Sequence, residues 1–184
     1  MSVTNERLSV LEYLVRNSPN RWIGRTALMK LCYFAQVLRS VPLGYNFSLY
    51  SYGPFDSAVL SDLGEAEALG VLKEGVTNYP SGYGYQISSA MAPENLPKIE
   101  SELLRKNQED LDFVLGEYGN SNAADLELAS TLIFADREAA ENNERISTDD
   151  LARRVKEVKP RFPIDYITKQ AEVLKEKRFF NAVV

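Results

Sequence analysis

The 184-residue sequence contains no histidine and only one cysteine, Cys32. Without imidazole the chain cannot form a Ser-His-Asp or Cys-His catalytic group, a histidine metal site or a histidine proton shuttle. One cysteine supports neither an intrachain disulfide nor a cysteine-only zinc site. Carboxylates, lysine, tyrosine and serine are present, but they form no recognisable catalytic constellation. We therefore expect no catalytic, cofactor-binding or metal-binding residues, no cofactor and no enzyme activity.

Long apolar runs are also missing. No stretch of about 18 apolar residues could span a bilayer, and the first ten residues, MSVTNERLSV, lack the apolar core of a signal peptide. We expect a cytoplasmic protein without a membrane partner. A hydrophobic fraction of 45% is sufficient for a folded core, and the place of Cys32 within an apolar helix predicts that it is a small buried hydrophobe.

The first half of the chain has the element order of a winged-helix unit. A first helix with an apolar stripe is predicted to start at an N-cap, Thr4, and to end at residues 17–20. A second helix is predicted to run to about Leu38. Trp22, which precedes it, is interpreted as a packing anchor. Pro42 and Gly44 then favour a turn. The stripe consists of Leu8, Leu11, Leu14 and Val15.

A short aromatic strand follows, from Tyr45 to Tyr52, and Gly53-Pro54 is predicted to end it. Asp56 is a suitable N-cap for a third helix, and Gly70 is a suitable residue just beyond its end. Two alternating segments on either side of residues 80–82 predict a β-hairpin, the wing.

The second half of the chain is predicted to be helical. Pro93 fits the first turn of a fourth helix over about residues 94–117, while Asn122, Ser147 and Phe162-Pro163 precede three more helices. No linker rich in glycine, serine or proline separates the halves. The sequence therefore predicts a mainly α (α+β) fold, with a winged-helix-like unit over residues 1–92 and a helical extension over residues 93–184 that shares its core in one compact domain.

Charge argues against nucleic-acid binding, the first function that a winged-helix order suggests. The third helix contains Asp62, Glu65 and Glu67 but no lysine or arginine, so phosphate groups would repel it. The chain is acidic from Glu94 to Asp150 and basic from Leu151 onward. The basic residues between Arg153 and Arg178 could contact phosphates, but the acidic segment offers nearer partners. A DNA-binding transcriptional regulator remains the alternative hypothesis.

Six of the ten tyrosines lie within the aromatic strand and the hairpin. Tyrosine supplies a large contact area at low entropic cost, so it is frequent in protein interfaces and also in half-buried sheets, and both interpretations stay open. The six are Tyr45, Tyr50, Tyr52, Tyr79, Tyr83 and Tyr85. As the candidate protein interface we take all of these except Tyr79.

Three motifs resemble the pattern "KLxYFAQ … GYxF … YxYGPF" of the Panacea domain family of SocA-like antitoxins. They are the runs over residues 28–36 (LMKLCYFAQ), 44–47 (GYNF) and 49–55 (LYSYGPF). Phe134-Ala135-Asp136 and the run over residues 159–162 (KPRF) are similar too. The long first helix and the added tyrosines are similar to the YwgA-like branch.

This resemblance implies a protein-binding module. Family members neutralise a partner toxin by direct contact, and one is an adaptor that delivers its toxin to a protease. The expected partner is therefore another protein, such as a toxin, rather than nucleic acid. The residues that match the motif are expected to serve the fold; they are Lys30, Tyr33, Phe34, Gly44, Gly53 and Pro54.

Overall fold

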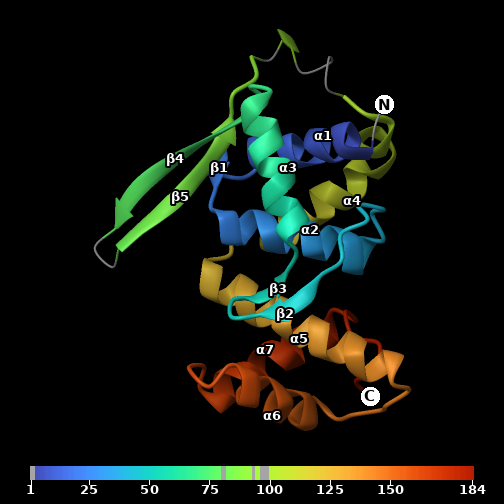
Figure 1. Ribbon diagram of the computed structural model, residues 1–184. Coiled ribbons are helices and arrows are strands. Elements are labelled where there is room, and N and C mark those ends of the chain that lie inside the picture. The colour runs from blue at the N-terminus through green and yellow to red at the C-terminus, as the bar shows by residue number, and fades with distance from the viewer. Residues whose placement is uncertain (1–2, 80–81, 93, 96–99) are drawn as a thin grey trace. The chain divides into compact units, whose positions relative to one another are not determined.

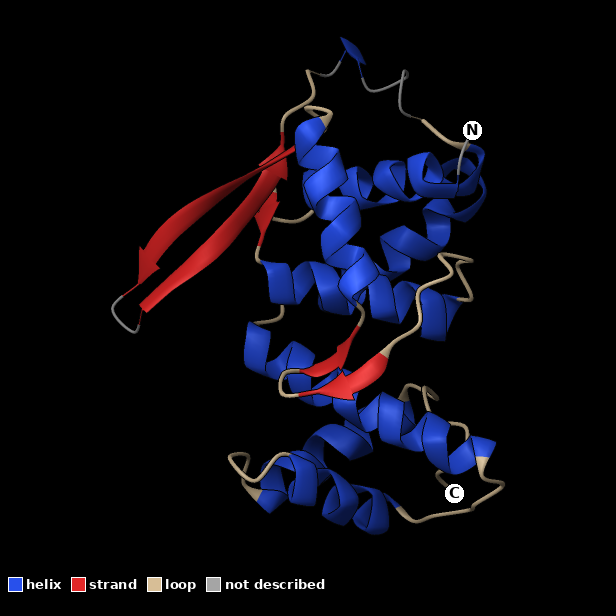
Figure 2. Ribbon diagram, viewed as in Figure 1, coloured by secondary structure: helices blue, strands red, loops and turns tan. Residues whose placement is uncertain are grey.

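The computed structural model describes residues 3–79, 82–92, 94–95 and 100–184. The chain is mostly helical, 58%, with seven helices and a small antiparallel sheet among the described residues, so the α+β prediction is confirmed (Figures 1 and 2). Its contacts divide it into two units. The first unit contains Met1–Ser48 and Phe55–Asn122, and the second contains Leu49–Pro54 and Ala123–Val184.

Four helices and a three-stranded sheet form the first unit. Helices α1 and α4 pack on each other, and both contact α2. The antiparallel sheet has the strand order β1-β5-β4, with Trp22 opposite Ser88 and Ile23 opposite Ile87. The hairpin of β4 and β5 extends away from the helices (Figure 1). The elements are α1 (Val3–Arg16), β1 (Trp22–Ile23), α2 (Arg25–Arg39), α3 (Ser57–Ala68), β4 (Leu72–Tyr79), β5 (Gly82–Ser89) and α4 (Glu102–Tyr118).

Helix α2 is the core of the first unit. Every residue from Leu28 to Ala35 is buried, including Cys32, as the apolar run predicted. The ring of Phe34 stacks on that of Tyr118 from α4, with 3.9 Å between their centroids. Burial on all sides of a helix requires neighbours on all sides, and α1, α3, α4 and β5 each contact α2.

The ends of α3 follow the local signals in the sequence. The Asp56 side chain accepts a hydrogen bond from the backbone N–H of Ala58, as an N-cap does. Gly70 has a φ of +69° and donates to the carbonyl of Glu67, while Val71 donates to that of Ala66. This pair of bonds is a Schellman motif, which requires a left-handed residue such as glycine.

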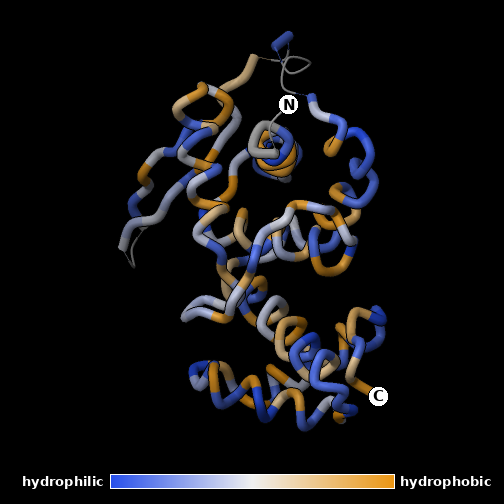
Figure 3. The backbone as a smooth tube through the Cα atoms, turned by 45° about the vertical axis from the view of Figure 1, so that its right-hand side comes forward, coloured by the Kyte–Doolittle hydropathy of each residue, from blue (hydrophilic) through white to orange (hydrophobic). Residues whose placement is uncertain are grey.

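The second unit consists of three helices and the segment Leu49–Pro54. Helix α5 (Ala123–Glu141) packs on α6 (Thr148–Val158) and α7 (Ile164–Glu176), and α6 packs on α7. Ser147 caps α6 by accepting from the N–H of Asp150, as predicted. Hydrophobic and hydrophilic residues alternate along α6 and α7, because each buries one face, whereas every residue of α5 from Leu126 to Ile133 is buried (Figure 3).

The last residues of the chain are fastened to α5 by Asp136. Its carboxylate is completely buried and accepts hydrogen bonds from the backbone N–H groups of Asn181, Ala182 and Val183, at 2.7, 2.9 and 3.1 Å. Arg137 pairs with the same carboxylate at 2.6 Å. The tail is therefore docked on α5.

Several predicted details were wrong. Thr4 is not an N-cap, because α1 already begins at Val3. Trp22 is not a packing anchor, because it lies on β1 with 37% of its surface exposed. Gly53-Pro54 does not end one long strand. Two short strands, β2 (Ser48–Tyr50) and β3 (Gly53–Phe55), form a hairpin here, because the φ of +87° at Gly53 lets the chain turn back.

The fourth helix also differs from its prediction. It begins at Glu102, because the side chain of Ser101 accepts from the N–H of Leu104 and caps it there. The predicted start at Pro93, with Leu96 and Ile99 in the helix, lies outside the described residues. The contacts divide the chain after Asn122 and not after residue 92, because α4 packs on α1 and α2.

Candidate functional site

The five tyrosines proposed as an interface occupy different environments. Tyr50 and Tyr52, 66% and 65% exposed, belong to the second unit, and Tyr83, 70% exposed, belongs to the first. Tyr85 is half-buried on β5. Tyr45 is only 5% exposed and cannot contact a partner from this position, so its place in the interface was wrong.

Tyr45 takes part in a buried polar cluster. Its hydroxyl donates to Asp62 at 2.7 Å, and Arg7 donates to the same carboxylate at 2.6 Å. Burial is the main cause of the raised pKa of Tyr45, and the bond to Asp62 contributes to it. Asp62 is itself buried, so it adds no charge to the exposed face of α3, contrary to the sequence-based interpretation. Glu65 and Glu67 remain exposed on that helix.

The two wing tyrosines, Tyr83 and Tyr85, contact each other, and Arg25 contacts Tyr85. The rings of Tyr83 and Tyr85 meet edge to face, with centroids 6.1 Å apart. The guanidinium of Arg25 lies 3.6 Å from the centroid of the Tyr85 ring and also donates two hydrogen bonds to Glu74, at 2.7 and 2.5 Å. Tyr85 is therefore held by a cation–π contact, while Tyr83 stays exposed.

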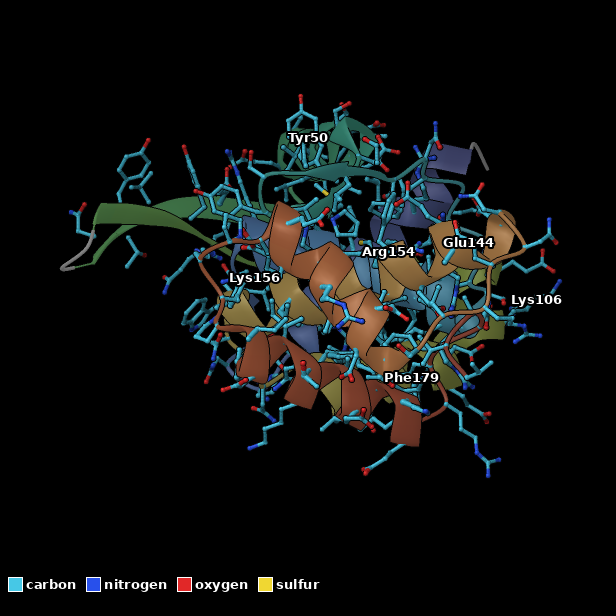
Figure 4. All side chains as sticks on the ribbon, turned by 90° about the horizontal axis from the view of Figure 1, so that it is seen from below. Tyr50, Lys106, Glu144, Arg154, Lys156 and Phe179 are labelled. Carbon is cyan, nitrogen blue, oxygen red and sulfur yellow. The ribbon has the colours of Figure 1, made fainter. Side chains whose placement is uncertain are left out.

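The β2–β3 hairpin displays the other two exposed tyrosines. Tyr50 ends β2, and Ser51 and Tyr52 form the turn before Gly53. The side chain of Tyr50 points away from the ribbon (Figure 4). Two large exposed aromatic side chains thus lie two positions apart in the sequence, on either side of exposed Ser51.

A buried lysine holds this turn from beneath. The Lys159 ammonium donates hydrogen bonds to the backbone carbonyls of Tyr50, at 3.3 Å, and of Ser51. It lies 3.1 Å from the carboxylate of Glu127 on α5, and the side chains of both residues are at most 4% exposed. Arg161 binds the second oxygen of Glu127 at 2.5 Å. A buried charge requires such partners, so the position of the turn is tied to this ion pair.

Gly53 fits closely against α5. A Cβ atom at this position would lie 3.0 Å from the Ser130 hydroxyl oxygen, 3.1 Å from that of Thr131 and 3.3 Å from the Glu127 carbonyl oxygen. Both hydroxyls are fixed, because each donates to that carbonyl. The residue also needs its positive φ, so glycine is required here for two independent reasons.

The other residues of the family-like motif also occupy structural positions. Lys30, Tyr33, Phe34 and Pro54 are buried, and Tyr33 packs edge to face on Phe47 at 5.2 Å. Gly44 turns the chain with a φ of +72°. The four buried side chains do not project into solvent, and exposed Gly44 serves the turn through its φ, which agrees with the expected role of these residues in the fold.

The basic residues after Leu151 are largely engaged. Arg153 pairs with Asp150 at 2.6 Å, and Arg154 pairs with Glu144 at 2.5 Å; Arg154 and Glu144 are labelled in Figure 4. Lys156 donates to two backbone carbonyls at 2.8 Å. The acidic segment thus supplies partners for four of the nine basic residues between Arg153 and Arg178, which are Arg153, Arg154, Lys159 and Arg161.

The role of Lys159, Glu127 and Arg161 was missed by sequence reasoning. The sequence placed Lys159 and Arg161 only among the basic residues that could contact phosphates, and the run over residues 159–162 in the family resemblance. A lysine beside proline at a helix end gives no local sign that it will be buried, and its partners lie 32 and 108 or more positions away. Only the folded chain brings them together.

Among the described residues, no three histidine, cysteine, aspartate or glutamate side chains are grouped so as to hold a metal ion. Nor does that part of the chain contain a helix that combines the length and apolar character needed to cross a bilayer. Comparison of the sequence with protein-family models and with curated proteins gave no match.

Proposed function

We propose that the chain is a non-enzymatic protein-interaction module, an antitoxin-type protein that neutralises a partner protein by direct binding. The observation that carries this proposal is the β2–β3 turn, which exposes Tyr50 and Tyr52 while Lys159 fixes its backbone from below. A turn that is already ordered loses little conformational entropy when a partner binds. Tyrosine side chains are rigid and large, and they are enriched among the residues that dominate interface energetics.

The position of the turn within the sequence supports the same proposal. Tyr50 and Tyr52 lie inside the motif that resembles the Panacea domain family, whose members bind toxins. In the run over residues 49–55 the exposed residues are Tyr50, Ser51 and Tyr52, whereas Gly53 and Pro54 are buried. The exposed tyrosines of the motif can therefore be substituted without changing its buried, fold-forming residues.

The test uses the open reading frame next to this gene. Expressed alone in a bacterial host, that reading frame should stop growth, and co-expression of the chain should restore it. Tyr50→Ser together with Tyr52→Ser should abolish the rescue. Leu69→Ser provides a matched control, because Leu69 is a large exposed side chain, 60% exposed, on no candidate surface. Circular dichroism should show that both variants are folded.

Two results would contradict this proposal. In the first, the neighbouring reading frame has no effect on growth. In the second, the double tyrosine variant rescues growth and co-purifies with the neighbouring protein as well as the unmodified chain does. A reproducible catalytic turnover that one carboxylate substitution abolishes would likewise contradict the assignment as a non-enzyme.

A winged-helix DNA-binding regulator is the second candidate. We propose that the first unit is a winged helix, which is supported by its element order and by the sheet order β1-β5-β4, with β4 and β5 as the wing. The charge of its surface does not favour DNA. Glu65 and Glu67 are exposed on α3, which has no basic residue, and Lys73 is the one basic residue in the two wing strands.

A gel-shift series with the promoter of this gene, from low to high salt, tests the regulator. Binding that weakens steeply as salt rises would indicate phosphate contacts and would favour this second candidate. We expect no salt-dependent shift.

A further inference from the structure

A groove crosses the face of the three-stranded sheet in the first unit. It encloses about 370 Å³ and is lined by Arg21, Trp22, Lys73, Glu74, Gly75, Gln86 and Ser88. In the register of the sheet, Ser88 stands opposite both Trp22 and Lys73, and Gly75 stands opposite Gln86. Directly opposed residues share one face of a sheet, so these five residues form a continuous surface across all three strands.

Two exposed basic side chains, Arg21 and Lys73, line the groove, and the carboxylate of Glu67 lies at its edge, where it accepts a hydrogen bond from the backbone N–H of Glu74 at 3.2 Å. The carboxylate of Glu74 is bound by two nitrogens of Arg25, so it is not available to its neighbours. Arg21 and Lys73 are both exposed, and neither forms an ion pair with any residue that the structure describes. Two exposed cations that line one groove are notable in a chain with a net charge of −5.

Shape and composition also fit a binding site. Gly75 leaves the floor open, since a Cβ atom there would meet no heavy atom within 4 Å. Trp22 exposes 37% of its surface along the groove. Arg21 has a φ of +56°, a conformation that costs a non-glycine residue energy and that persists only when surrounding contacts maintain it. Tryptophan and arginine are the residue types most enriched among interface hot spots.

We propose that this groove binds a short acidic segment of a partner protein, with carboxylates at Arg21 and Lys73 and an apolar side chain against Trp22. Complementary charge is the argument for an acidic partner. Nucleic acid fits less well, because a phosphate backbone requires many cations, while the wing strands add none besides Lys73. The inference deepens the protein-binding function proposed above and rests on it.

The experiment selects peptides from a displayed library of random octapeptides and measures the binding of the enriched sequences by fluorescence anisotropy. We expect aspartate and glutamate to be enriched together with an apolar residue. Gly75→Leu fills the groove, and Arg21→Glu with Lys73→Glu reverses its charge; each should weaken the Kd at least about tenfold. Gly116→Leu is the matched control, because Gly116 on α4 also faces open space, and it should bind as the unmodified chain does.

Enriched peptides without acidic residues, or acidic peptides that bind Gly75→Leu with an unchanged Kd, would overturn the proposal. A DNA duplex that displaces the peptides at low salt, and that loses binding in the charge-reversed variant, would assign the groove to nucleic acid instead. Displacement of the peptides by millimolar inorganic phosphate would show that the groove is only a simple anion site.

The growth-rescue assay separates this inference from the proposed function. If Tyr50→Ser with Tyr52→Ser abolishes rescue while both groove variants retain it, the groove proposal fails and the protein-binding function stands. If no partner is neutralised but acidic peptides bind the groove, the antitoxin-type function fails and the groove remains a peptide site. Loss of rescue in the groove variants, with Gly116→Leu unaffected, supports both.

Discussion

The ammonium of Lys159 and the carboxylate of Glu127 lie 3.1 Å apart in the interior of the second unit. The same ammonium binds the carbonyls of Tyr50 and Ser51, so one buried charge connects α5, the end of α6 and the β2–β3 turn. Charges are rarely buried unless they are paired and hydrogen-bonded, and here both conditions are met. The exposed tyrosines of the turn depend on this arrangement.

Lys159→Met should destabilise the protein strongly. Methionine fills a similar volume but leaves two carbonyls and one side of a buried carboxylate without a donor, and removal of one partner of a buried pair costs about 3–5 kcal/mol. Because Arg161 still binds Glu127, we expect the loss in the free energy of unfolding, measured by urea denaturation, to lie near the lower end of this range. Lys159→Met with Glu127→Leu removes both charges and should recover part of the loss. A single variant as stable as the parent would refute the role of this lysine.

Gly53→Ala should lower the free energy of unfolding more than Gly44→Ala does. Both glycines have a positive φ, +87° and +72°, so both substitutions incur a backbone penalty of about 1–2 kcal/mol. At Gly44 a Cβ atom meets nothing within 4 Å, whereas at Gly53 it meets two hydroxyls and a carbonyl. Overpacking adds about 1–3 kcal/mol at Gly53 alone. Equal melting temperatures for the two variants would show that α5 can move away from the turn.

Asp136→Ala should release the C-terminal tail. Three backbone N–H groups lose their acceptor, and each hydrogen bond to a charged group contributes about 1.5–3 kcal/mol. The amides of Asn181, Ala182 and Val183 should then exchange with solvent much faster, as measured by hydrogen–deuterium exchange. Asp149→Ala is a control on an exposed aspartate of the same unit. Unchanged protection of these amides in Asp136→Ala would mean that other contacts hold the tail.

Stability should fall at alkaline pH. Burial, together with the hydrogen bond to Asp112, raises the pKa of Tyr13 to about 12, compared with about 10 in an unfolded chain. The folded state therefore keeps a proton that the unfolded state loses, so the contribution of Tyr13 to stability is complete below pH 10 and disappears as pH rises toward 12. The pKa values of Tyr45 and Tyr118 are raised in the same direction, mainly by burial.

Denaturation curves between pH 9 and 12 measure this effect, with tyrosinate absorbance as a second signal. Tyr13→Phe should make the fall less steep, because phenylalanine has no proton to lose. An identical slope in the variant would show that Tyr13 titrates equally in the folded and unfolded chain.

Much of the secondary structure was predictable because its signals are local. Asp56 and Ser147 cap helices through backbone groups two or three residues away, and Gly70 ends α3 through its own φ. The apolar helix around Cys32 predicted burial of that residue, and the structure buries every residue from Leu28 to Ala35. Such features require no knowledge of distant parts of the chain.

Features that depend on distant partners were not predictable. Trp22 looked like a core residue, but it lies on a two-residue edge strand beside Ser88, and burial there depends on what covers the sheet. Asp62 looked like surface charge, because nothing near it indicates that Arg7, 55 positions earlier, will neutralise it. Tyr45 and Tyr50 lie close in sequence, yet one is buried and the other exposed. In each case tertiary contacts decide the outcome.

Lys159 holds the β2–β3 turn by its carbonyl oxygens, which every amino acid possesses. The shape of this loop is therefore largely independent of which side chains it carries at positions 50 and 52. Such a loop can change its specificity without refolding: a library randomised at these two positions should consist mostly of folded proteins. The scaffold is thus suited to evolving recognition of new partners, in nature or in the laboratory.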